Sequence, residues 1–523
     1  MRMRGKLKIA AGVLLLFLLA SLLSVWSYGR FARSAQGQPS QVLPVAGAST
    51  DIDALVEPLL AAYPGHAGLS LVADNRDAFA IRAFSARHAG RSLDAMYYIW
   101  HDDMTGGLLD AELLAAADRG VRVRLLLDDM TAHGSSQKRL AALDAHPSIE
   151  VRLFNPTRER ANPLTRGLDL LLRSWSVNRR MHNKAWIVDN RIAVVGGRNV
   201  GDEYFDAAEE TNFLDADVAL IGPPVAETSA IFDEFWNDAA ALPIAALVRH
   251  GDKALADLRL RMRASADTPQ ALRWREHLEA AHDLDALLRR RAQLHWADAD
   301  DVHVHSDPAS KVRGEQPQRW MLPILAAYLT EARRSLQVVS PYFVPGEGGL
   351  LLVWALRARG AEVDIITNSL AANDVVAVHS GYAPYREPLL QAGARLFELK
   401  PHGASDSSLF GSSGASLHTK AFVVDDVLGF IGSFNMDPRS ARLNTEMGVV
   451  FRHPGAVAEL QALVASKLVG EASYEVVLTS DGALRWRDGT AQPPRDWARE
   501  PETGWWLRTV SRMIGWLPIE SQL

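Results

Sequence analysis

The hydrophobic and polar positions of the chain repeat one order of elements twice. Near residue 100, the apolar run SLDAMYYIW, an amphipathic stretch ending in Arg-Gly and the apolar run VRVRLLLDD follow one another. Near residue 340, the same order returns as SLQVVSPYFV, a stretch ending in Arg-Gly and AEVDIITNS. Short apolar runs that alternate with helical stretches of this kind predict βαβ units. Gly120 and Gly360 directly follow the two helical stretches and are expected to end them.

The repeat predicts an α/β protein with two homologous lobes, each a mixed β-sheet flanked by helices. Between the lobes, ALADLRLRMR and HDLDALLRRRAQL indicate connecting helices. The expected order is an N-terminal membrane segment, a linker, the first lobe, the connecting helices, the second lobe and a C-terminal extension, at residues 1–35, 36–51, 52–245, 246–297, 298–475 and 476–523.

The longest apolar run lies near the N-terminus. Residues 9–26 hold eighteen positions without a charge, directly after the basic stretch MRMRGKLK. This length just spans a bilayer, whereas a cleaved signal has a shorter apolar core and a small-residue cleavage site. The only candidate site, ARSA, contains an arginine, so we favour an uncleaved transmembrane helix over a signal. The basic flank would stay in the cytoplasm, which places the lobes on the periplasmic side of a bacterial inner membrane.

The amino-acid composition indicates a globular protein and excludes several kinds of site. Of the 523 residues, 48% are hydrophobic and 23% are charged, as in a globular protein with a large core. The net charge of −6 does not fit a protein that coats nucleic acid. The chain has no cysteine, which excludes disulfides, thiolate metal sites and a cysteine nucleophile.

Each lobe carries one copy of a chemically unusual strand. The copies are HNKAWIVDNRIAVVGGRN, from His182, and HTKAFVVDDVLGFIGSFN, from His418. In both, Lys follows the His by two positions, Asp by seven, Gly by fourteen and Asn by seventeen. Residues i and i+2 of a strand face the same way, so His and Lys project together. A single such pair is usually a solvated strand edge, but two copies in one register indicate a shared site.

Two His, two Lys and two Asn that face one another would form a cationic pocket suited to a phosphodiester. Lys and Asn can hold the phosphate oxygens and stabilise their charge. One His can attack phosphorus, while the other protonates the leaving alcohol and then deprotonates the incoming one. This scheme needs no metal and no cofactor, and we expect neither.

The two copies resemble the signature of the phospholipase D superfamily, His-x-Lys-x4-Asp-x6-Gly-Ser/Gly-x-Asn, which its members carry twice. The first copy has Gly197 where Ser is commoner, and the second has Ser433. Over nearly the whole chain after the N-terminal run, the sequence is similar to bacterial cardiolipin synthases, in particular to their C-type branch. This similarity is carried by runs such as YYIWHDDMTGGLL, SPYFVPG, ITNSLAANDVVAVHSGYAPYR and the C-terminal LPIE.

The resemblance implies an active site at the interface of the two lobes and a covalent phosphohistidine. His182 would be the nucleophile and His418 the general acid and base, with the reverse assignment left open. Members also carry an acid that orients a catalytic His. It maps onto Glu446 in the second lobe and onto Asp215 in the first, with Asp217 as the fallback.

The candidate site residues fall into two further groups. The motif residues counted as catalytic are His182, Lys184, Asp189, His418, Lys420 and Asp425, although the two Asp are more often structural in the family. The expected phosphate ligands are Asn199, Asn435, Ser433 and Gly197, the last through its backbone N–H.

The resemblance also implies transphosphatidylation. Phosphatidylglycerol, or alternatively phosphatidylethanolamine, would donate a phosphatidyl group to His182, and a second phosphatidylglycerol would accept it to give cardiolipin. The alternative is a phospholipase D that releases phosphatidic acid. A phosphodiesterase or nuclease is less favoured, because the chain has a membrane segment and lacks a basic nucleic-acid-binding tract. The donor lipid, the need for an accessory protein and the oligomeric state stay open.

Three other segments carry weaker signals. PLTRGLDLLLRSWSVNRR, at 163–180, fits either an interfacial membrane segment or an ordinary amphipathic helix. The C-terminal GWWLRTVSRMIGWLPIESQL combines three Trp with Arg, so we expect it to contact a membrane. HSGYAPYR, at 379–386, is expected to shape the pocket or its lid.

Overall fold

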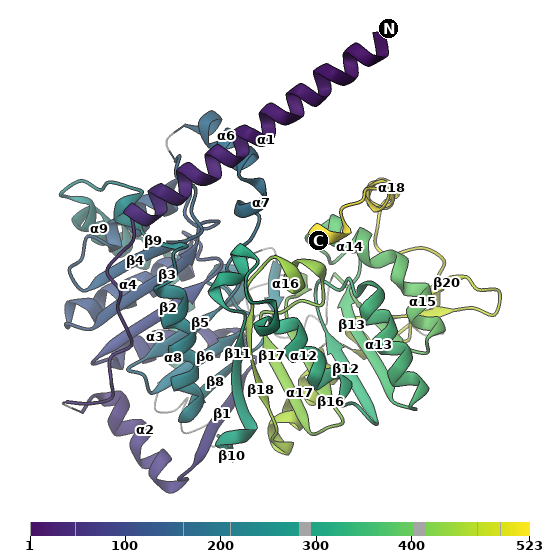
Figure 1. Ribbon diagram of the computed structural model, residues 1–523. Coiled ribbons are helices and arrows are strands. Elements are labelled where there is room, and N and C mark those ends of the chain that lie inside the picture. The colour runs from purple at the N-terminus through teal and green to yellow at the C-terminus, as the bar shows by residue number, and fades with distance from the viewer. Residues whose placement is uncertain are drawn as a thin grey trace.

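Two β-sheets covered by helices form the body of the protein, and one long helix projects from it (Figure 1). The figure shows the computed structural model, which describes residues 2–47, 49–160, 162–209, 211–281, 294–401, 414–467, 469–491 and 493–523. The two sheets belong to the two predicted lobes, and the predicted α/β fold class is confirmed.

The sheet of the first lobe has nine strands among the described residues, in the order β10-β1-β8-β6-β5-β2-β3-β4-β9. These strands are β1 His66–Val72, β2 Ser92–Tyr97, β3 Arg122–Asp128, β4 Ile149–Phe154, β5 Ala185–Val188, β6 Ile192–Gly196, β8 Asp217–Ile221, β9 Ala241–Pro243 and β10 His295–Asp298. The helices of this half are α2 Asp51–Ala62, α3 Asn75–His88, α4 Met104–Asp118, α5 Ser135–Leu143, α6 Pro163–Leu172, α7 Ser174–Val177, α8 Pro223–Trp236, α9 Ala254–Ala266 and α10 Pro269–Ala281.

The sheet of the second lobe has ten strands among the described residues, in the order β11-β18-β17-β16-β12-β13-β14-β19-β20-β21. These strands are β11 Val302–Ser306, β12 Ser335–Val339, β13 Glu362–Asn368, β14 Arg395–Leu399, β16 Lys420–Val424, β17 Leu428–Gly432, β18 Met447–Phe451, β19 Ser473–Leu478, β20 Leu484–Asp488 and β21 Arg495–Trp497. The helices of this half are α12 Met321–Thr330, α13 Gly346–Ala358, α14 Val376–Tyr382, α15 Arg386–Gln391, α16 Pro438–Arg442, α17 Pro454–Lys467 and α18 Trp505–Gly515.

Six strands of each sheet share one topology. In the first lobe, the parallel strands β2, β3 and β4 lie beside the antiparallel strands β5, β6 and β8. The second lobe repeats this arrangement with β12, β13 and β14 beside β16, β17 and β18. β5 and β16 run antiparallel to the parallel strands. Each His-x-Lys pair therefore lies beside the C-terminal ends of the parallel strands. Ligand sites of α/β sheets collect at those ends.

The two predicted glycine caps are present. Gly120 follows α4 with φ +92°, and Gly360 follows α13 with φ +85°. These left-handed values are costly for residues with a Cβ, so glycine ends each helix and lets the chain turn directly into β3 or β13.

The two lobes are joined along their interface by backbone pairing and a shared core. Strand β7 (Thr211–Leu214) of the first lobe pairs in parallel with β15 (Gly414–Leu417) of the second. One continuous cluster of buried side chains includes Val195 and Val218 from the first sheet together with Ile431 and Val449 from the second. The lobes therefore form one body rather than two hinged ones.

The strands extend beyond the limits that the sequence pattern suggests. Strand β10 falls within the expected connecting helices, yet it pairs with β1 at the edge of the first sheet. Strand β19 crosses the expected end of the second lobe at 475, and β20 and β21 continue that sheet into the C-terminal extension. α9 and α10 lie in the expected connection, whereas residues 282–293, with most of HDLDALLRRRAQL, lie outside the described residues.

The N-terminal helix α1 (Arg2–Ser34) contains one segment, Ala11–Ser34, that is long and apolar enough to cross a membrane. The predicted linker after it is fixed along the first lobe. Its Ser40 N–H donates to Asn237 at 3.0 Å, and its Val42 N–H donates to Asp233 at 2.8 Å. The base of α1 is therefore held against the lobe.

Candidate active site

The two motif histidines meet the opposite lobe through their backbones. His182 precedes β5, and its N–H donates to the carbonyl oxygen of Thr445 at 2.9 Å. His418 precedes β16, and its N–H donates to the carbonyl oxygen of Leu214, also at 2.9 Å. Thr445 and Leu214 each stand directly before an acid in the chain, so each histidine is brought beside the acid of the other lobe.

Each histidine side chain is hydrogen-bonded to that acid. Nδ1 of His182 lies 2.7 Å from Oε2 of Glu446, and Nδ1 of His418 lies 2.5 Å from Oδ2 of Asp215. With Nδ1 bound to a carboxylate, Nε2 is the ring nitrogen left for a substrate. Asp217, the fallback acid, binds the guanidinium group of Arg82 at 2.9 Å instead. The preferred match, Asp215, is thus the acid beside a motif histidine.

The two motif lysines lie fully inside the interface. Nζ of each donates to the carbonyl oxygen of its motif histidine, at 2.6 Å for Lys184 and 2.5 Å for Lys420. Burial lowers the pKa of Lys184 well below its usual value, although Glu446 acts to raise it. Burial lowers the pKa of Lys420 to about 8, against the raising effect of Asp215. Lys420 therefore remains mostly positively charged at neutral pH.

The two acids differ in charge. Burial raises the pKa of Glu446 to about 7, and the positive charge of Lys184 offsets this only in part. Burial acts in the same direction on Asp215, but the attraction of His418 and Lys420 outweighs it and leaves the pKa lowered. Asp215 is therefore ionised at neutral pH, whereas Glu446 is partly protonated.

The two histidines differ as a result. Burial, reinforced by Lys184 and Lys420, lowers the pKa of His182 well below its usual value. Burial and Lys420 also lower the pKa of His418, but the ionised Asp215 acts in the opposite direction. The surroundings favour a neutral His182 and make His418 the better place for a proton.

Ser433 and Gly197 do not occupy the roles that the sequence predicts for them. The hydroxyl of Ser433 donates to Oε2 of Glu446 at 2.5 Å, so it holds the acid rather than facing a phosphate. A side chain at Gly197 would overlap Oδ1 of Asp215. The Gly197 N–H, predicted as a phosphate donor, donates to the carbonyl oxygen of Ala216 at 3.1 Å. Both positions thus serve the acids.

The two motif asparagines lie in different surroundings. Asn199 is held on both sides: its Oδ1 accepts from the N–H of Ile99 at 3.2 Å, and its Nδ2 donates to the hydroxyl of Tyr204 at 2.8 Å. Oδ1 of Asn435 is buried and meets no hydrogen-bond partner within the part of the chain that the structure describes. Asn435 therefore keeps polar capacity for a ligand.

The two motif aspartates are structural. The carboxylate of Asp189 accepts from the three successive backbone N–H groups of residues 90–92 at 2.8–3.0 Å. Asp425 does the same for residues 333–335 at 2.7–3.0 Å. Strands β5 and β16 separate these carboxylates from the His-Lys pairs by roughly 13 Å, the length of four extended residues. The structure does not bring the two aspartates to the site, which corrects their place in the catalytic set.

Several side chains beside the histidines are not part of the motif. The ring of Tyr98 packs edge-on against His182, with centroids 4.9 Å apart, and Tyr204 packs edge-on against His418 at 5.2 Å. The hydroxyl of Ser440 donates to Oε1 of Glu446 at 2.9 Å. Tyr98 directly follows β2, and the carboxyl end of a predicted strand is a signal that could have found it. Ser440 carries no such signal.

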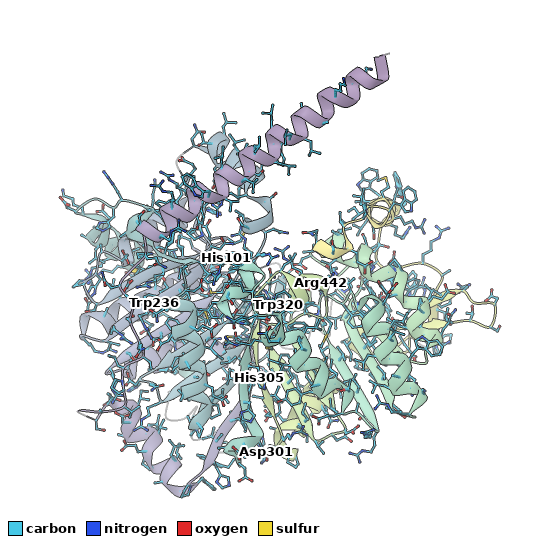
Figure 2. The ribbon with its side chains drawn as sticks, in the orientation of Figure 1. His101, Trp236, Asp301, His305, Trp320 and Arg442 are labelled. Carbon is cyan, nitrogen blue, oxygen red and sulfur yellow. The ribbon has the colours of Figure 1, made fainter. Side chains whose placement is uncertain are left out.

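The rim of the interface is charged on both sides. His101, 3.1 Å from Glu203, lies on the first-lobe side, and Arg442 lies on the second-lobe side (Figure 2). Between the lobes, Nη2 of Arg439 donates to the carbonyl oxygen of Asn178 at 2.8 Å. No group of three or more His, Asp or Glu side chains among the described residues is arranged to hold a metal ion.

Comparisons with known proteins identify the family of the chain. The sequence profile of the family described as "Cardiolipin synthase, PLD-like domain" matches residues 86–236 and 325–467. Cardiolipin synthase C of Escherichia coli strain K12 is 39% identical over 89% of this chain and 98% of its own length. An uncharacterized protein of Helicobacter pylori strain 26695 is 33% identical over 78% of this chain and 80% of its own.

A solved structure shares the fold. Phosphatidylserine synthase of Haemophilus influenzae superposes with a TM-score of 0.51 at 14% identity, over 76% of this chain and 86% of that chain. At this identity the superposition shows a shared fold only, whereas the sequence similarity shows the family. The chain belongs to the cardiolipin synthase family of the phospholipase D superfamily.

Proposed function

We propose that this protein is a cardiolipin synthase-like phosphatidyltransferase that works through a phosphohistidine. The observation that carries the proposal is the crossed pairing of the two histidines with two acids across the lobe interface. The family relationship supports phospholipids as substrates, because the relative that is 39% identical is named a cardiolipin synthase.

The reaction has two displacements at phosphorus. In the first, Nε2 of His182 attacks the phosphorus of phosphatidylglycerol, the bond to the headgroup oxygen breaks, and His418 gives that oxygen its proton. In the second, His418 takes the proton of a glycerol hydroxyl on another phosphatidylglycerol, and its oxygen displaces His182 from phosphorus. The products are cardiolipin and glycerol. With phosphatidylethanolamine as donor, the released alcohol is ethanolamine.

The different charges of the two pairs support this order of events. A nucleophile must attack as a neutral imidazole, and burial beside two lysines favours that form of His182. A general acid must carry a proton, and the ionised Asp215 favours that proton on His418, although burial and Lys420 lower the pKa of His418. In the reverse assignment, the proton would sit beside Glu446, which is itself partly protonated.

The remaining site residues act on the phosphate. Lys184 and Lys420, together with Asn199 and Asn435, stabilise charge on its non-bridging oxygens as the displacements proceed. Glu446 and Asp215 position the histidines, and Ser433 positions Glu446. The scheme assigns no step to a metal or a cofactor.

We further propose that α1 anchors the protein in a bacterial inner membrane with both lobes on the periplasmic side. The basic residues before the apolar segment support this orientation. Lipid substrates would then reach the site from the bilayer in which the protein is anchored.

The test places the purified full-length protein in vesicles of phosphatidylglycerol, with and without phosphatidylethanolamine, and follows the lipid products by mass. Cardiolipin from phosphatidylglycerol alone supports that lipid as donor, and a requirement for phosphatidylethanolamine identifies the other donor. Phosphatidic acid without cardiolipin contradicts transfer and shows a phospholipase. The matched controls are His182→Ala and Val427→Ala, the second at an exposed turn far from the site.

A preparation that forms no lipid product would contradict the proposal for this chain acting alone. Cell extract is then added to the vesicles to detect an accessory protein. Single-stranded DNA is offered in parallel, because release of nucleotides would identify a nuclease of the same superfamily.

A further inference from the structure

Two amphipathic helices, one in each half of the molecule, expose apolar side chains. On α6, Leu164, Leu168 and Leu171 are 83%, 54% and 56% exposed. Spaced by four and three residues, they form one stripe along the helix. Single exposed leucines are ordinary, but a stripe of them on a surface helix indicates a contact surface.

The second helix is α18, near the C-terminus. Trp505 and Trp506 at its start are 71% and 61% exposed, and Trp516 directly after its end is 83% exposed. The other side of the helix lies on the second lobe, where the hydroxyl of Ser511 is 3.0 Å from that of Ser380 on α14. The tryptophans are therefore on the side of α18 that faces solvent.

A buried ionic network fixes the chain just before α18. Nη1 of Arg386 donates to Oε1 of Glu500 at 2.8 Å, and Nε2 of His379 lies 3.1 Å from the same oxygen. Nε of Arg386 also donates to Glu398 at 2.6 Å. The sequence predicts that segment 379–386 shapes the pocket or its lid, but the structure uses these two side chains to hold the C-terminal extension on the second lobe.

α6 and α18 lie at the end of the molecule from which α1 projects, opposite α2 and β10 (Figure 1). α1 packs against α6. The guanidinium group of Arg173, directly after α6, stacks on the ring of Tyr28 in α1 at 3.3 Å. The C-terminal end of the apolar stripe on α6 therefore lies beside Tyr28, within the candidate membrane-spanning segment Ala11–Ser34.

The same two helices flank the lobe interface. α7 follows α6 and ends at Val177, five residues before His182. After α18, Oε1 of Gln522 accepts from Asn178 at 2.8 Å, and the carbonyl oxygen of Leu523 accepts from the N–H of Arg439 at 2.5 Å. The chain after α6 and α7 therefore reaches His182, and the chain after α18 contacts Asn178 and Arg439 at the interface of the lobes.

We propose that α6 and α18 lie in the headgroup region of the bilayer that α1 crosses, and that together they dock the lobe interface against its surface. A bilayer is the occupant because α1 leaves the body beside α6, because Trp prefers membrane interfaces, and because the exposed Arg512 suits anionic headgroups. α1 alone tethers the body. Contacts on both sides of the site fix its orientation, so that headgroups reach the histidines.

The absence of cysteine from the chain permits a direct test. Single cysteines replace Leu168 on α6 and Trp516 after α18. Matched controls replace Tyr63, after α2, and Val427, in the turn between β16 and β17, which are 44% and 46% exposed. Each full-length variant carries a nitroxide label in vesicles of phosphatidylglycerol and phosphatidylethanolamine. Collisions with oxygen, which partitions into lipid, and with a water-soluble nickel complex report the surroundings of each label.

The proposal expects a severalfold higher ratio of oxygen to nickel collisions at positions 168 and 516 than at 63 and 427. Equal ratios at all four positions would overturn it. A high ratio at 168 alone would also overturn it, because α18 would then lie in water. Shielding of position 516 from both reagents would indicate a protein partner instead. The readout does not require turnover, so its failure is distinct from a failure of the proposed reaction.

Discussion

Ser433 and Gly197 occupy the same position in the two copies of the motif, but the acids beside them differ. Glu446 receives a hydrogen bond from the Ser433 hydroxyl, whereas Asp215 lies where a side chain at position 197 would be. Each residue thus matches the acid of its own lobe, and each acid serves the histidine of the other lobe. These differences make the two histidines chemically unequal.

Replacing Ser433 by Ala should slow the reaction without unfolding the protein. The variant loses one charge-assisted hydrogen bond, which corresponds to about 1.5–3 kcal/mol, or roughly a ten- to hundredfold lower kcat. Because the Ser433 hydroxyl lowers the pKa of Glu446, the pH profile should also shift upward. Steady-state kinetics across pH measure both effects, and an unchanged kcat with an unchanged profile would show that Ser433 does not position the acid.

The lowered pKa of Lys420 predicts that activity falls at alkaline pH. Its pKa of about 8 means that it is cationic at neutral pH and becomes neutral as the pH rises through about 8. The pocket then loses a charge that we propose binds the phosphate, so kcat/KM should fall across that range. Lys420→Arg keeps its charge and should retain its own activity to higher pH. A kcat/KM that stays constant well above pH 8 would contradict this role.

At the scale of elements, each motif strand joins the lobe interface at one end to a backbone-binding aspartate at the other. Lys184 precedes β5, and Asp189 follows it and binds the backbone at the start of β2. In the second lobe, Lys420 and Asp425 stand in the same way at the ends of β16. The spacing of the motif therefore reflects the length of a strand as well as the chemistry of the site.

Asp189→Ala should reduce stability rather than catalysis. It removes the acceptor of three backbone N–H groups, of which only that of Ser92 is fully buried, so the loss should cost about 1–3 kcal/mol. We expect a lower thermal midpoint, while kcat per folded molecule stays near that of the unchanged protein. Thermal unfolding measures the midpoint. Steady-state kinetics, divided by the fraction of molecules that are folded, measure kcat per folded molecule. A kcat that falls while the thermal midpoint is unchanged would return Asp189 to the catalytic set.

The regular elements were predictable and the irregular ones were not. Apolar runs and the caps Gly120 and Gly360 predict β2, β3, β12 and β13, and the repeated motif predicts β5 and β16, because these strands are buried and bounded by clear turns. β10 and β21 are edge strands, and β20 lies beside β21; a weaker apolar pattern suffices at these margins of the sheets. The backbone contacts that fix the linker, such as that of Val42 to Asp233, leave no periodic signal at all.

At the scale of the whole molecule, the site exists only when both lobes are in place. His182 and Glu446 are separated by 264 positions, and His418 and Asp215 by 203. The motif and its acids could be found in the sequence. Which acid partners which histidine could not, because that depends on how the two sheets pack. The buried cluster shared by both sheets fixes that packing.

The N-terminal segment should remain on the mature protein. An anchor leaves residues 1–35 in the membrane fraction, and a cleaved signal removes them. Peptide mapping of the protein extracted from membranes measures this directly, with protease treatment of intact cells and of spheroplasts to locate the lobes. A mature chain that begins after residue 35 would contradict the anchor. Digestion only in lysed spheroplasts would contradict the periplasmic placement.

The central claim is that the phosphatidyl group passes through His182. The most direct measurement mixes the full-length protein with phosphatidylglycerol, quenches at alkaline pH, digests the chain and locates the added mass on its peptides. The account predicts a phosphatidyl adduct on the peptide that contains His182, formed during turnover and absent from His182→Ala. Transfer with the adduct on the peptide that contains His418, or transfer with no adduct on either, would contradict it.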